Sequence, residues 1–497
     1  MAFPKRILMR ACCDPTVNYS TFEVIKNDHI WNNSGNMIFP YSIYRTLACE
    51  GVEITTYRNI TPKDADFINE NYDMFVIPLA NAFRANHIKA LGNLTNIIKK
   101  LNIPCVVIGV GMQAGANPDP NASYPFDEAT KDFCTAVLER SKSIGVRGDF
   151  TKQYLLHLGF NDEEIDVIGC PSMYLHGREM QITKKKEHLD ENSVLCMNGH
   201  ANIPPQVLAL FENVRNTHKG EHYFIGQELR DMKLLYAGVS FDNAPANYPG
   251  RATDDIYLGG HYRIFGTVPS WIDFLKKADF SFGCRIHGNI TATLAGTPSM
   301  IFAGDSRTQE LAEYHGLPYI LASEVTPDMS LSALYDSLDY TKFNATHAKN
   351  FDHYIDFLDY NNIDHIYNHG GENYFDKKIA ETVFDEGTKP LFSVSPKEAA
   401  ERICLYSQYT AGIEKGLREK IDNLNKTSAA SATTSATASE TEELKKTIPR
   451  LRIKLKDAEE KYAEYEKTSK EEIEELTKKV RRLRIKLKDA EEKLGLR

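Results

Sequence analysis

Residues 278–298, ADFSFGCRIHGNITATLAGTP, combine the residue types in this sequence that are best able to do chemistry. An apolar run leads into a turn that carries Arg285 and His287, and we expect a helix to begin near Asn289. Residues two apart on extended backbone point the same way, so both side chains would project from the carboxyl end of a strand. Ligands bind there in open α/β sheets, and Gly288 would permit close approach. An arginine, a histidine and a helix N-terminus predict a site for an anion that undergoes proton transfer.

A structural role explains the same two residues. Arg285 would then form an interdomain salt bridge, and His287 would be a core residue that caps the helix. Spacing alone leaves both interpretations open.

Two further turns carry charged side chains at the same kind of position. Arg147 lies at the end of the run SIGVRG, and Asp305, Ser306 and Arg307 follow the run SMIFAG. Three arginines at three strand ends predict a binding site for a doubly charged substrate, although a single arginine is more often structural. An ordinary helix N-cap is the alternative role of Asp305 or Ser306.

A fourth segment, WNNSGNMIFPYSIYRTLACEG, places Asn33, Gly35 and Asn36 just before a predicted helix. Such a loop would let the backbone approach a ligand. The sequence has no G-x-G-x-x-G after its first strand and no Walker loop, so neither common nucleotide-binding fingerprint is present.

Short apolar runs alternate with helical patterns over the first 170 or so residues. We expect strands at RILMRAC (6–12), EITTYR (53–58), MFVIPL (74–79), CVVIGVG (105–111), SIGVRG (143–148) and DVIGCP (166–171). Helical patterns separate them, notably at 87–101 and 125–142. The runs are near-continuous rather than alternating, which predicts a parallel sheet covered by helices on both faces.

The pattern restarts after the polar segment 184–193. Further strands are expected at SVLCMN (193–198), HYFIGQ (222–227), DFSFGC (279–284), SMIFAG (299–304) and YILA (319–322), with helices at 268–278 and 307–316. Two successive βα arrays predict an α/β fold of two doubly wound, Rossmann-like domains that face each other across a cleft. We expect these domains at 1–185 and 190–425, the second with a helical extension.

Composition narrows the class of protein. The 497 residues are 42% hydrophobic and 26% charged, which is ordinary for a globular chain of two or three units. No apolar run approaches the roughly 18–20 residues that span a bilayer. The nine cysteines form no CxxC or Cys/His ligand spacing, so we expect reduced thiols, a cytoplasmic location and no metal site. A net charge of −9 gives no support for nucleic-acid binding.

The C-terminal part has a different character. A Ser/Ala/Thr-rich linker is expected at 426–440, followed by a tail, 441–497, in which LRIKLKDAEEK occurs at 451–461 and again at 483–493. Its heptads slip by four residues, so the tail is either one coiled coil with a stutter or a helical hairpin. It would form a homo-oligomer or a complex. The basic segment 481–488 could also dock on anionic lipid at the inner face of the membrane, as a peripheral contact.

An ordered set of motifs carries a family resemblance. N-x-S-G-N near the start, GVRGDFT, DVIGCPS, FGCRIHGNITATLAGTPSM and DSRTQEL resemble, in this order, the polysaccharide pyruvyl transferase family. The resemblance spans roughly residues 30–320. Its most specific part is the Arg-x-His-Gly element, with a helix of small residues and Gly-x-Pro behind it.

The resemblance implies a fold similar to that of the B-type glycosyltransferases. It implies an enzyme that moves the pyruvyl group of phosphoenolpyruvate onto two hydroxyls of a sugar, forms a ketal and releases phosphate. Arg285, Ile286, His287 and Gly288 would contact phosphoenolpyruvate, and Arg147 would hold its phosphate or carboxylate. His287 would be the acid and base, because a histidine pKa can lie near neutral pH.

Further candidate substrate-binding residues are Asn33, Gly35, Asn36, Asn81, Asp305, Ser306, Arg307 and Glu310. No metal and no organic cofactor is expected, since phosphoenolpyruvate is a co-substrate. The acceptor would be a sugar or glycan of a bacterial surface polysaccharide, either as polymer or as lipid-linked precursor.

Two departures from the family pattern affect the acceptor side. Asn36 stands where family members often have Asp, which leaves no carboxylate there to act as a base. PLANAF (78–83) stands where they often have a Gly-Gly-Gly turn, so Asn81, together with Arg84, would line a different acceptor-side wall.

Two rival functions remain at this stage. One is a nucleotide-sugar glycosyltransferase of the same architecture, in which Arg307 and Glu310 would suit a diphosphate. The other is a non-catalytic scaffold of a glycan-assembly complex, with the tail as its working part.

Overall fold

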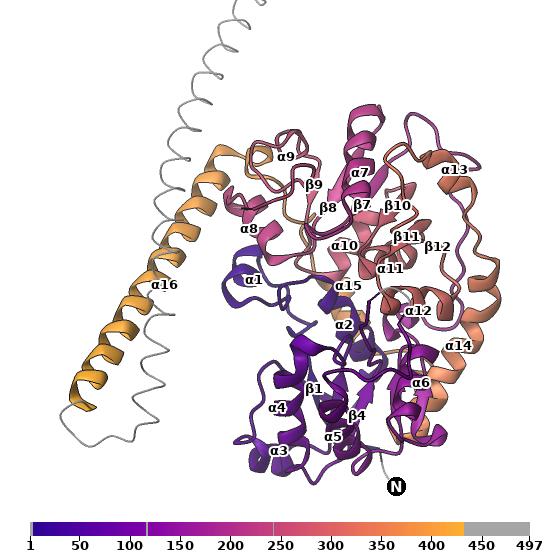
Figure 1. The fold of residues 1–497 in the computed structure, drawn as a ribbon, viewed down its shortest axis with the longest axis vertical. Helices are drawn as coiled ribbons and strands as arrows, with labels where there is room; N and C mark the ends of the chain where they lie inside the picture. The colour runs from indigo at the N-terminus through magenta and orange to yellow at the C-terminus, as the bar shows by residue number, and fades with distance from the viewer. Residues whose placement is uncertain (1–2, 116–117, 242, 432–497) are drawn as a thin grey trace, which may run out of the picture. The chain divides into compact units, whose positions relative to one another are not determined.

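The computed structural model describes residues 3–115, 118–241 and 243–431. Residues up to Ser395 form one compact unit, and the part that begins at Pro396 forms a second. The first unit is a mixed α/β structure with parallel sheets, as its alternating apolar runs predict (Figure 1).

The first sheet has four parallel strands in the order β2-β1-β3-β4. They are β1 (Arg6–Arg10), β2 (Glu53–Tyr57), β3 (Met74–Pro78) and β4 (Cys105–Ile108). Every residue of β3 and β4 is buried, which explains why their sequences are unbroken apolar runs. A separate parallel pair, β5 (Ile144–Val146) and β6 (Ile165–Val167), adjoins this sheet through a bridge between Val110 and Val146.

Helices separate these strands along the chain. They are α1 (Thr21–Asn27), α2 (Gly35–Leu47), α3 (Ala65–Asn71), α4 (Ile88–Ile98), α5 (Asp127–Leu138) and α6 (Asp149–His157), with the short 3-10 helices η1 (Ala85–His87), η2 (Asp162–Glu164) and η3 (Pro171–Tyr174).

The second sheet has six parallel strands in the order β12-β11-β10-β7-β8-β9. They are β7 (Leu195–Asn198), β8 (His222–Ile225), β9 (Tyr262–Arg263), β10 (Phe280–Gly283), β11 (Ser299–Ala303) and β12 (Tyr319–Leu321). Five of them were expected. β9 was not, because a strand of two residues leaves no periodic pattern in the sequence.

The helices of this half and of its extension complete the first unit. They are α7 (Pro205–Thr217), α8 (Leu229–Ala237), α9 (Asp255–Leu258), α10 (Val268–Leu275), α11 (Ile286–Leu294), α12 (Ser306–His315), α13 (Leu331–Asp336), α14 (Thr341–Tyr360), η4 (Ile366–His369), α15 (Tyr374–Glu381) and η5 (Leu391–Ser393).

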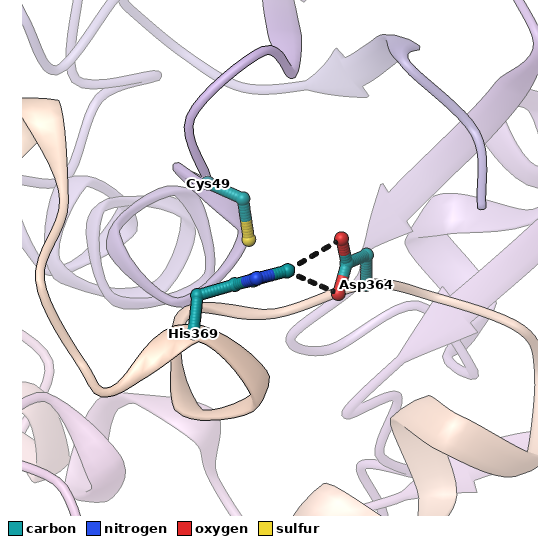
Figure 2. Close-up of side chains that lie close together, drawn as sticks. All are labelled: Cys49, Asp364 and His369. Carbon is teal, nitrogen blue, oxygen red and sulfur yellow. Dashed lines mark hydrogen bonds and ion pairs between the residues drawn. The ribbon is translucent and has the colours of Figure 1, made fainter.

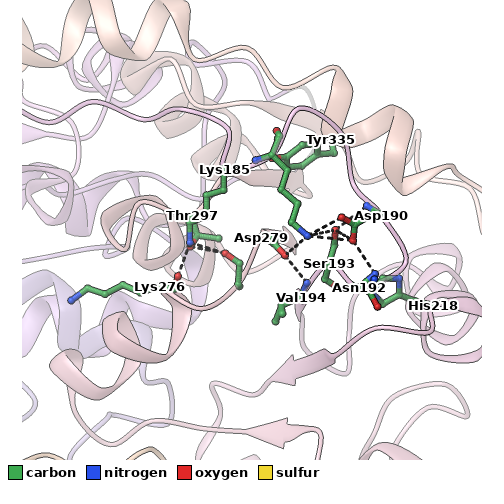
Figure 3. A network of polar contacts seen from close by, with 12 residues as sticks. Lys185, Asp190, Asn192, Ser193, Val194, His218, Lys276, Asp279, Thr297 and Tyr335 are labelled. Atoms are coloured by element: carbon green, nitrogen blue, oxygen red, sulfur yellow. Dashed lines mark hydrogen bonds and ion pairs between the residues drawn. The ribbon is translucent and has the colours of Figure 1, made fainter.

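The polar segment between the two arrays is held in place by its lysines. The Nζ atom of Lys185 donates to the carbonyl oxygens of Lys276 and Ala278, each at 2.7 Å. Lys186 pairs with Asp190 on its own segment and with Asp279, the residue before β10. Figure 3 shows Lys185, Asp190 and Asp279 in this network of polar contacts. These bonds anchor the crossover to the second sheet.

Residues 341–376 follow the second array in the sequence but make many of their contacts with the first. Tyr354 of α14 stacks on Tyr174 of η3, with ring centroids 4.9 Å apart. Asp376 of α15 forms an ion pair with Arg45 of α2 at 2.7 Å. The chain therefore crosses between the two halves at 184–193 and again after β12, and it returns to the second half after α15, where Thr388 forms a bridge with Ile264.

The second unit contains the helix α16 (Pro396–Ser431). Its end corrects the expected linker, because residues 426–431 continue the helix. Alanine has the highest intrinsic helix propensity, and Thr-Ser-Ala-Ala-Ser contains no residue that must end a helix. The rest of the predicted linker, to residue 440, and the predicted coiled-coil or hairpin tail, 441–497, lie outside the described residues.

Within the described part of the chain, no helix is both long enough and apolar enough to cross a membrane.

Candidate active site

The turn after β10 is more compact than the sequence suggests. The helix α11 begins at Ile286, with Arg285 as its N-cap, rather than near Asn289. Asn289 lies inside the first turn and donates from Nδ2 to the carbonyl oxygen of Gly283 at 2.9 Å. His287 is therefore helical, and the expectation that Arg285 and His287 project side by side from extended backbone is wrong.

Arg285 is held by a carboxylate. Its Nη2 atom lies 2.5 Å from Oε1 of Glu228, and its backbone N–H donates to Oδ1 of Asn198 at 2.9 Å. The salt bridge that the sequence left open therefore exists. It lies within the second half of the chain rather than between the two halves.

His287 is buried at the meeting point of the two halves, with 7% of its surface exposed. A Cβ atom at Gly35 would lie 3.0 Å from the Cβ atom of His287 and 3.1 Å from its Nδ1 atom. Burial, and then the positive charges of Arg147, Arg307 and Arg285, hold the pKa of His287 well below its usual value. The imidazole is therefore neutral at pH 7 and surrounded by three cations.

Arg147 is fully buried, at 0% exposure. Its Nε atom donates to the carbonyl oxygen of Gly109 at 2.9 Å, and its guanidinium lies 4.9 Å from the ring centre of Phe39. Neither Nη atom has a hydrogen-bond partner among the described residues. Burying a cation without pairing it is costly, so these donors are expected to meet an anionic ligand.

Glu310 of α12 is the carboxylate that influences Arg147 electrostatically, and it is itself held by Thr151. Its two oxygens accept from the backbone N–H of Thr151 at 3.2 Å and from the Thr151 hydroxyl at 3.1 Å. Burial raises the pKa of Glu310 to about 7. A Cβ atom at Gly148 would collide with the Glu310 side chain, so this glycine gives Glu310 its room.

The turn after β11 joins the same site. Asp305 caps α12 by accepting from the backbone N–H of Thr308 at 2.9 Å, which confirms its N-cap role. Arg307 reaches Asp305 at 3.3 Å, while its Nε atom is buried without a partner among the described residues. Asp305 also accepts from Gln113 at 3.2 Å, and Gln113 in turn accepts from Asn81 at 2.7 Å. This chain of bonds connects the two halves beside the site.

Ser306 and Ile286 have structural surroundings. The Ser306 hydroxyl bonds to the backbone of Ala114 at 3.4 Å, and Ile286 is a core residue with 5% of its surface exposed.

The asparagines of the early loop shape the turn before α2. Oδ1 of Asn33 accepts from the backbone N–H of Gly35 at 2.9 Å. Nδ2 of Asn36 donates to the carbonyl oxygens of Ile30 and Trp31 at 3.1 and 3.2 Å. Both amides therefore hold the loop that brings Gly35 against His287.

A cavity of about 330 Å³ lies at the carboxyl edge of the first sheet. Its lining includes three residues singled out in the sequence, Asn36, Asn81 and Arg84. The full lining is Arg10, Trp31, Asn36, Phe39, Pro40, Arg58, Asn59, Pro78, Leu79, Ala80, Asn81, Ala82, Arg84 and His87. Phe39 connects this cavity to Arg147, because the Phe39 ring also makes a cation–π contact with the Arg147 guanidinium.

A family model described as polysaccharide pyruvyl transferase matches residues 33–306, more than half of the chain. The chain belongs to this family. The matched segment begins in the loop that carries Asn33 and Gly35 and ends at the start of α12, so it includes fully buried Arg147, half-buried Arg285 and buried His287.

Individual proteins resemble this family member only weakly. No protein with a curated description matches its sequence. Among solved structures, S. aureus MnaA in a co-structure with UDP is 13% identical at a TM-score of 0.36 and covers 77% of this chain and 99% of its own. A UDP-GlcNAc 2-epimerase from Methanocaldococcus jannaschii is 12% identical at 0.38, covering 71% and 99%. The calicheamicin glycosyltransferase CalG4 is 11% identical at 0.30, covering 73% and 95%. Scores this low assign no function.

Three site residues of this family member were not found from the sequence. They are Asn198, which ends β7, and Gln227 and Glu228, which follow β8. Asn198 and Glu228 hold Arg285, and Gln227 is 1% exposed with neither amide atom bonded to a described residue. Their position in the sequence could have indicated them, because residues at the ends of parallel strands meet at one edge of the sheet.

One group of side chains in the described part of this family member could hold a metal ion. Donor atoms of Cys49, Asp364 and His369 lie within 4.8 Å of one another (Figure 2). His369 already bonds both Asp364 oxygens, at 2.9 and 3.0 Å. Cys49 follows the C-terminal end of α2, about 20 Å along that helix from Gly35 at the helical rise of 1.5 Å per residue. An ion there would be remote from His287.

Proposed function

We propose that this protein transfers the pyruvyl group of phosphoenolpyruvate to two hydroxyls of a sugar, forms a cyclic ketal and releases phosphate. The observation that carries the proposal is fully buried Arg147, whose two Nη atoms have no hydrogen-bond partner among the described residues and whose charge acts on the neutral imidazole of His287. Family membership supports a transferase that acts on polysaccharide.

The charges fit a small substrate with two anionic groups. Phosphoenolpyruvate carries a phosphate and a carboxylate on three carbons, and a guanidinium binds either group through two parallel hydrogen bonds. Arg147 offers two free donors, and Arg307 offers a buried Nε. Glu228 pairs with Arg285 and Asp305 pairs with Arg307, whereas Arg147 forms no ion pair with any described residue. Arg147 is therefore the primary anion ligand in this proposal, and Arg307 assists it through its Nε atom.

His287 moves the protons in this proposal. One sugar hydroxyl adds across the double bond, so that its oxygen bonds to the central carbon and its proton reaches the methylene carbon by way of His287. The second hydroxyl then displaces phosphate at the central carbon, and its proton leaves with His287 or with phosphate. A bound anion offsets the three positive charges that depress the pKa of His287, so the ring gains basicity when substrate arrives.

This chemistry calls for no redox step, and the arginines supply the positive charge. We therefore expect turnover to need neither a metal nor an organic cofactor. Treatment with a chelator should leave the rate of phosphate release unchanged. A loss of rate that is restored by added zinc or magnesium would contradict this expectation.

The deciding experiment incubates the protein with phosphoenolpyruvate and a panel of sugars and glycans. Mass spectrometry should detect a pyruvate ketal on one acceptor, together with an equal amount of free phosphate. His287→Gln should form neither product at a comparable rate. Consumption of a nucleotide sugar instead would indicate a glycosyltransferase. Inertness toward both donor classes across the panel would favour a scaffold.

A further inference from the structure

The cavity at the carboxyl edge of the first sheet, here called the edge cavity, is built from strand ends. Arg10 ends β1, Arg58 follows β2, and Pro78 ends β3. Arg10 and Tyr57 are register partners, so the ends of β1 and β2 are level. Ligands of open parallel sheets bind at this edge, and a volume near 330 Å³ is within the roughly 300–1,000 Å³ of small-molecule sites.

The charged side chains that line the edge cavity are all cationic. Arg10, Arg58 and Arg84 line it together with His87, and no Asp or Glu belongs to the lining. Arg58 is paired with Asp28 at 3.4 Å. Arg10 and Arg84 form no salt bridge with any described residue: Arg10 donates to the Pro78 carbonyl at 3.3 Å, and the buried Nε of Arg84 has no partner.

Burial and neighbouring positive charge both lower the pKa values of the groups that line the edge cavity. Burial lowers the pKa of Arg10 to about 10. Burial, then Arg84 and Arg10, lower the pKa of His87 to about 4. The pKa of Arg84 is lowered by burial and by Arg307. Without a ligand, the edge cavity therefore has an excess of positive charge, which an anionic ligand would neutralise.

An aromatic residue at the edge cavity is held in an unusual backbone conformation. Trp31 has a φ of 45° and the next residue, Asn32, a φ of 62°. A bulky residue in the left-handed region is uncommon, and such strain clusters at ligand sites. The guanidinium of Arg10 lies 4.3 Å from the Trp31 ring centre. Arg10 therefore covers one face of the Trp31 ring, and a sugar ring in the cavity would stack its C–H groups on the opposite face.

The edge cavity adjoins the proposed phosphoenolpyruvate site. Phe39 lines the cavity, and its ring makes a cation–π contact with Arg147. A Cβ atom at Gly111 would meet both Arg147 Cδ, at 3.2 Å, and the carbonyl oxygen of cavity residue Ala80, at 3.3 Å. A ligand in the cavity would therefore lie next to the group that receives the donor.

We propose that the edge cavity binds the acceptor, and that the acceptor is a sugar bearing a negative charge, as a carboxylate or a phosphate. The role of this ligand as the acceptor rests on the proposed function, whereas the binding of an anionic sugar at the edge cavity does not. A neutral sugar would leave half-buried Arg10 and Arg84 without a carboxylate or phosphate partner, whereas an anion would pair with them.

The test is equilibrium binding by calorimetry with the full-length protein. The probes are UDP-N-acetylglucosamine, a glucuronic acid disaccharide, and maltose as the neutral match. At least one anionic probe should bind roughly 10-fold or more tightly than maltose, the scale of one charged hydrogen bond. Which anionic probe binds tighter distinguishes a phosphate from a carboxylate. Binding should persist when phosphoenolpyruvate is present, because the two ligands occupy neighbouring sites.

Variants assign the binding to the cavity. Arg84→Gln should lower the affinity for the anionic probe by roughly 10-fold, and Arg84→Lys should restore part of that affinity. Arg263→Gln is the matched control, since Arg263 lines a separate cavity of about 200 Å³ that contains Glu221 and Glu386. It should leave the affinity unchanged.

Equal affinity for maltose and for the anionic probes in the unaltered protein would overturn the inference without any variant. So would an Arg84→Gln protein that binds the anionic probe normally. Efficient ketal formation on neutral sugars alone would overturn it while leaving the proposed function intact. Anionic binding that depends on Arg84, without any pyruvyl transfer, would support the cavity and reject the proposed function.

Discussion

Gly35 and His287 touch across the two halves of the molecule, with the position of a Cβ at residue 35 only 3.1 Å from Nδ1 of the imidazole. Gly35 is the first residue of α2, so its backbone could accept a side chain. Space, rather than conformation, requires the glycine.

Gly35→Ala should therefore displace His287 by a few tenths of an ångström. We expect kcat for pyruvyl transfer to fall roughly 10-fold or more, because small misplacement of a catalytic group is costly. Gly92→Ala is the control, since Gly92 is in the interior of α4 and, apart from its own helix, no described residue lies within 4 Å of a Cβ there. That change should stabilise the protein by about 0.5–1 kcal/mol without altering the rate. Equal rates for the two variants would contradict the contact.

The pH profile reports the charges around His287. Because burial and three arginines lower its pKa, the acidic limb of kcat/KM should lie below pH 6.5. Arg307→Gln removes one of these positive charges, so the pKa of His287 should rise and the acidic limb should move to higher pH. A pH titration of both proteins measures this, and a shift toward lower pH would exclude His287 as the titrating group.

Arg147 should require a guanidinium rather than any cation. Arg147→Lys keeps the charge but loses both the bond to Gly109 and the two-donor fork. We expect KM for phosphoenolpyruvate to rise on the order of 10- to 100-fold. Arg140→Lys, at an arginine that bonds the Leu101 carbonyl, is the control and should leave KM unchanged. An unchanged KM in Arg147→Lys would remove Arg147 from the site.

Glu310 links stability to pH. Its folded pKa of about 7 is above the ordinary 4.5, so the unfolded chain ionises first as pH rises. Its contribution is fully present below pH 4.5 and is lost as pH rises through 7. Glu310→Gln should flatten this part of the stability curve and be more stable at pH 8, on the order of 1–3 kcal/mol. Unfolding in denaturant at several pH values tests it, and parallel curves for the two proteins would contradict the raised pKa.

Periodicity revealed most of the fold because the strands are buried on both faces. The runs MFVIP and CVVI were identifiable as strands since nothing polar interrupts them, while β9 has only Tyr262 and Arg263. The start of α11 was misplaced because Asn289 resembles a cap residue, yet its amide turns back to the carbonyl of Gly283.

The site could be predicted only in part. Arg147, His287 and Arg307 end or follow strands, a local property that a sequence displays. That Glu228 neutralises Arg285, or that Gly35 contacts His287, depends on tertiary packing between distant segments. Arg10 and Trp31 were not singled out because neither belongs to a recognisable motif.

The second crossing of the chain has a consequence for its synthesis. A protein generally folds from its N-terminus as it leaves the ribosome. Here Arg45 and Tyr174 can contact Asp376 and Tyr354 only after those residues have been synthesised, much later in translation. The first half can begin to collapse early, but its last contacts form only after the second half has emerged. The nascent N-terminal array is thus an incomplete intermediate, and the order of translation delays assembly of the site until nearly the whole first unit exists.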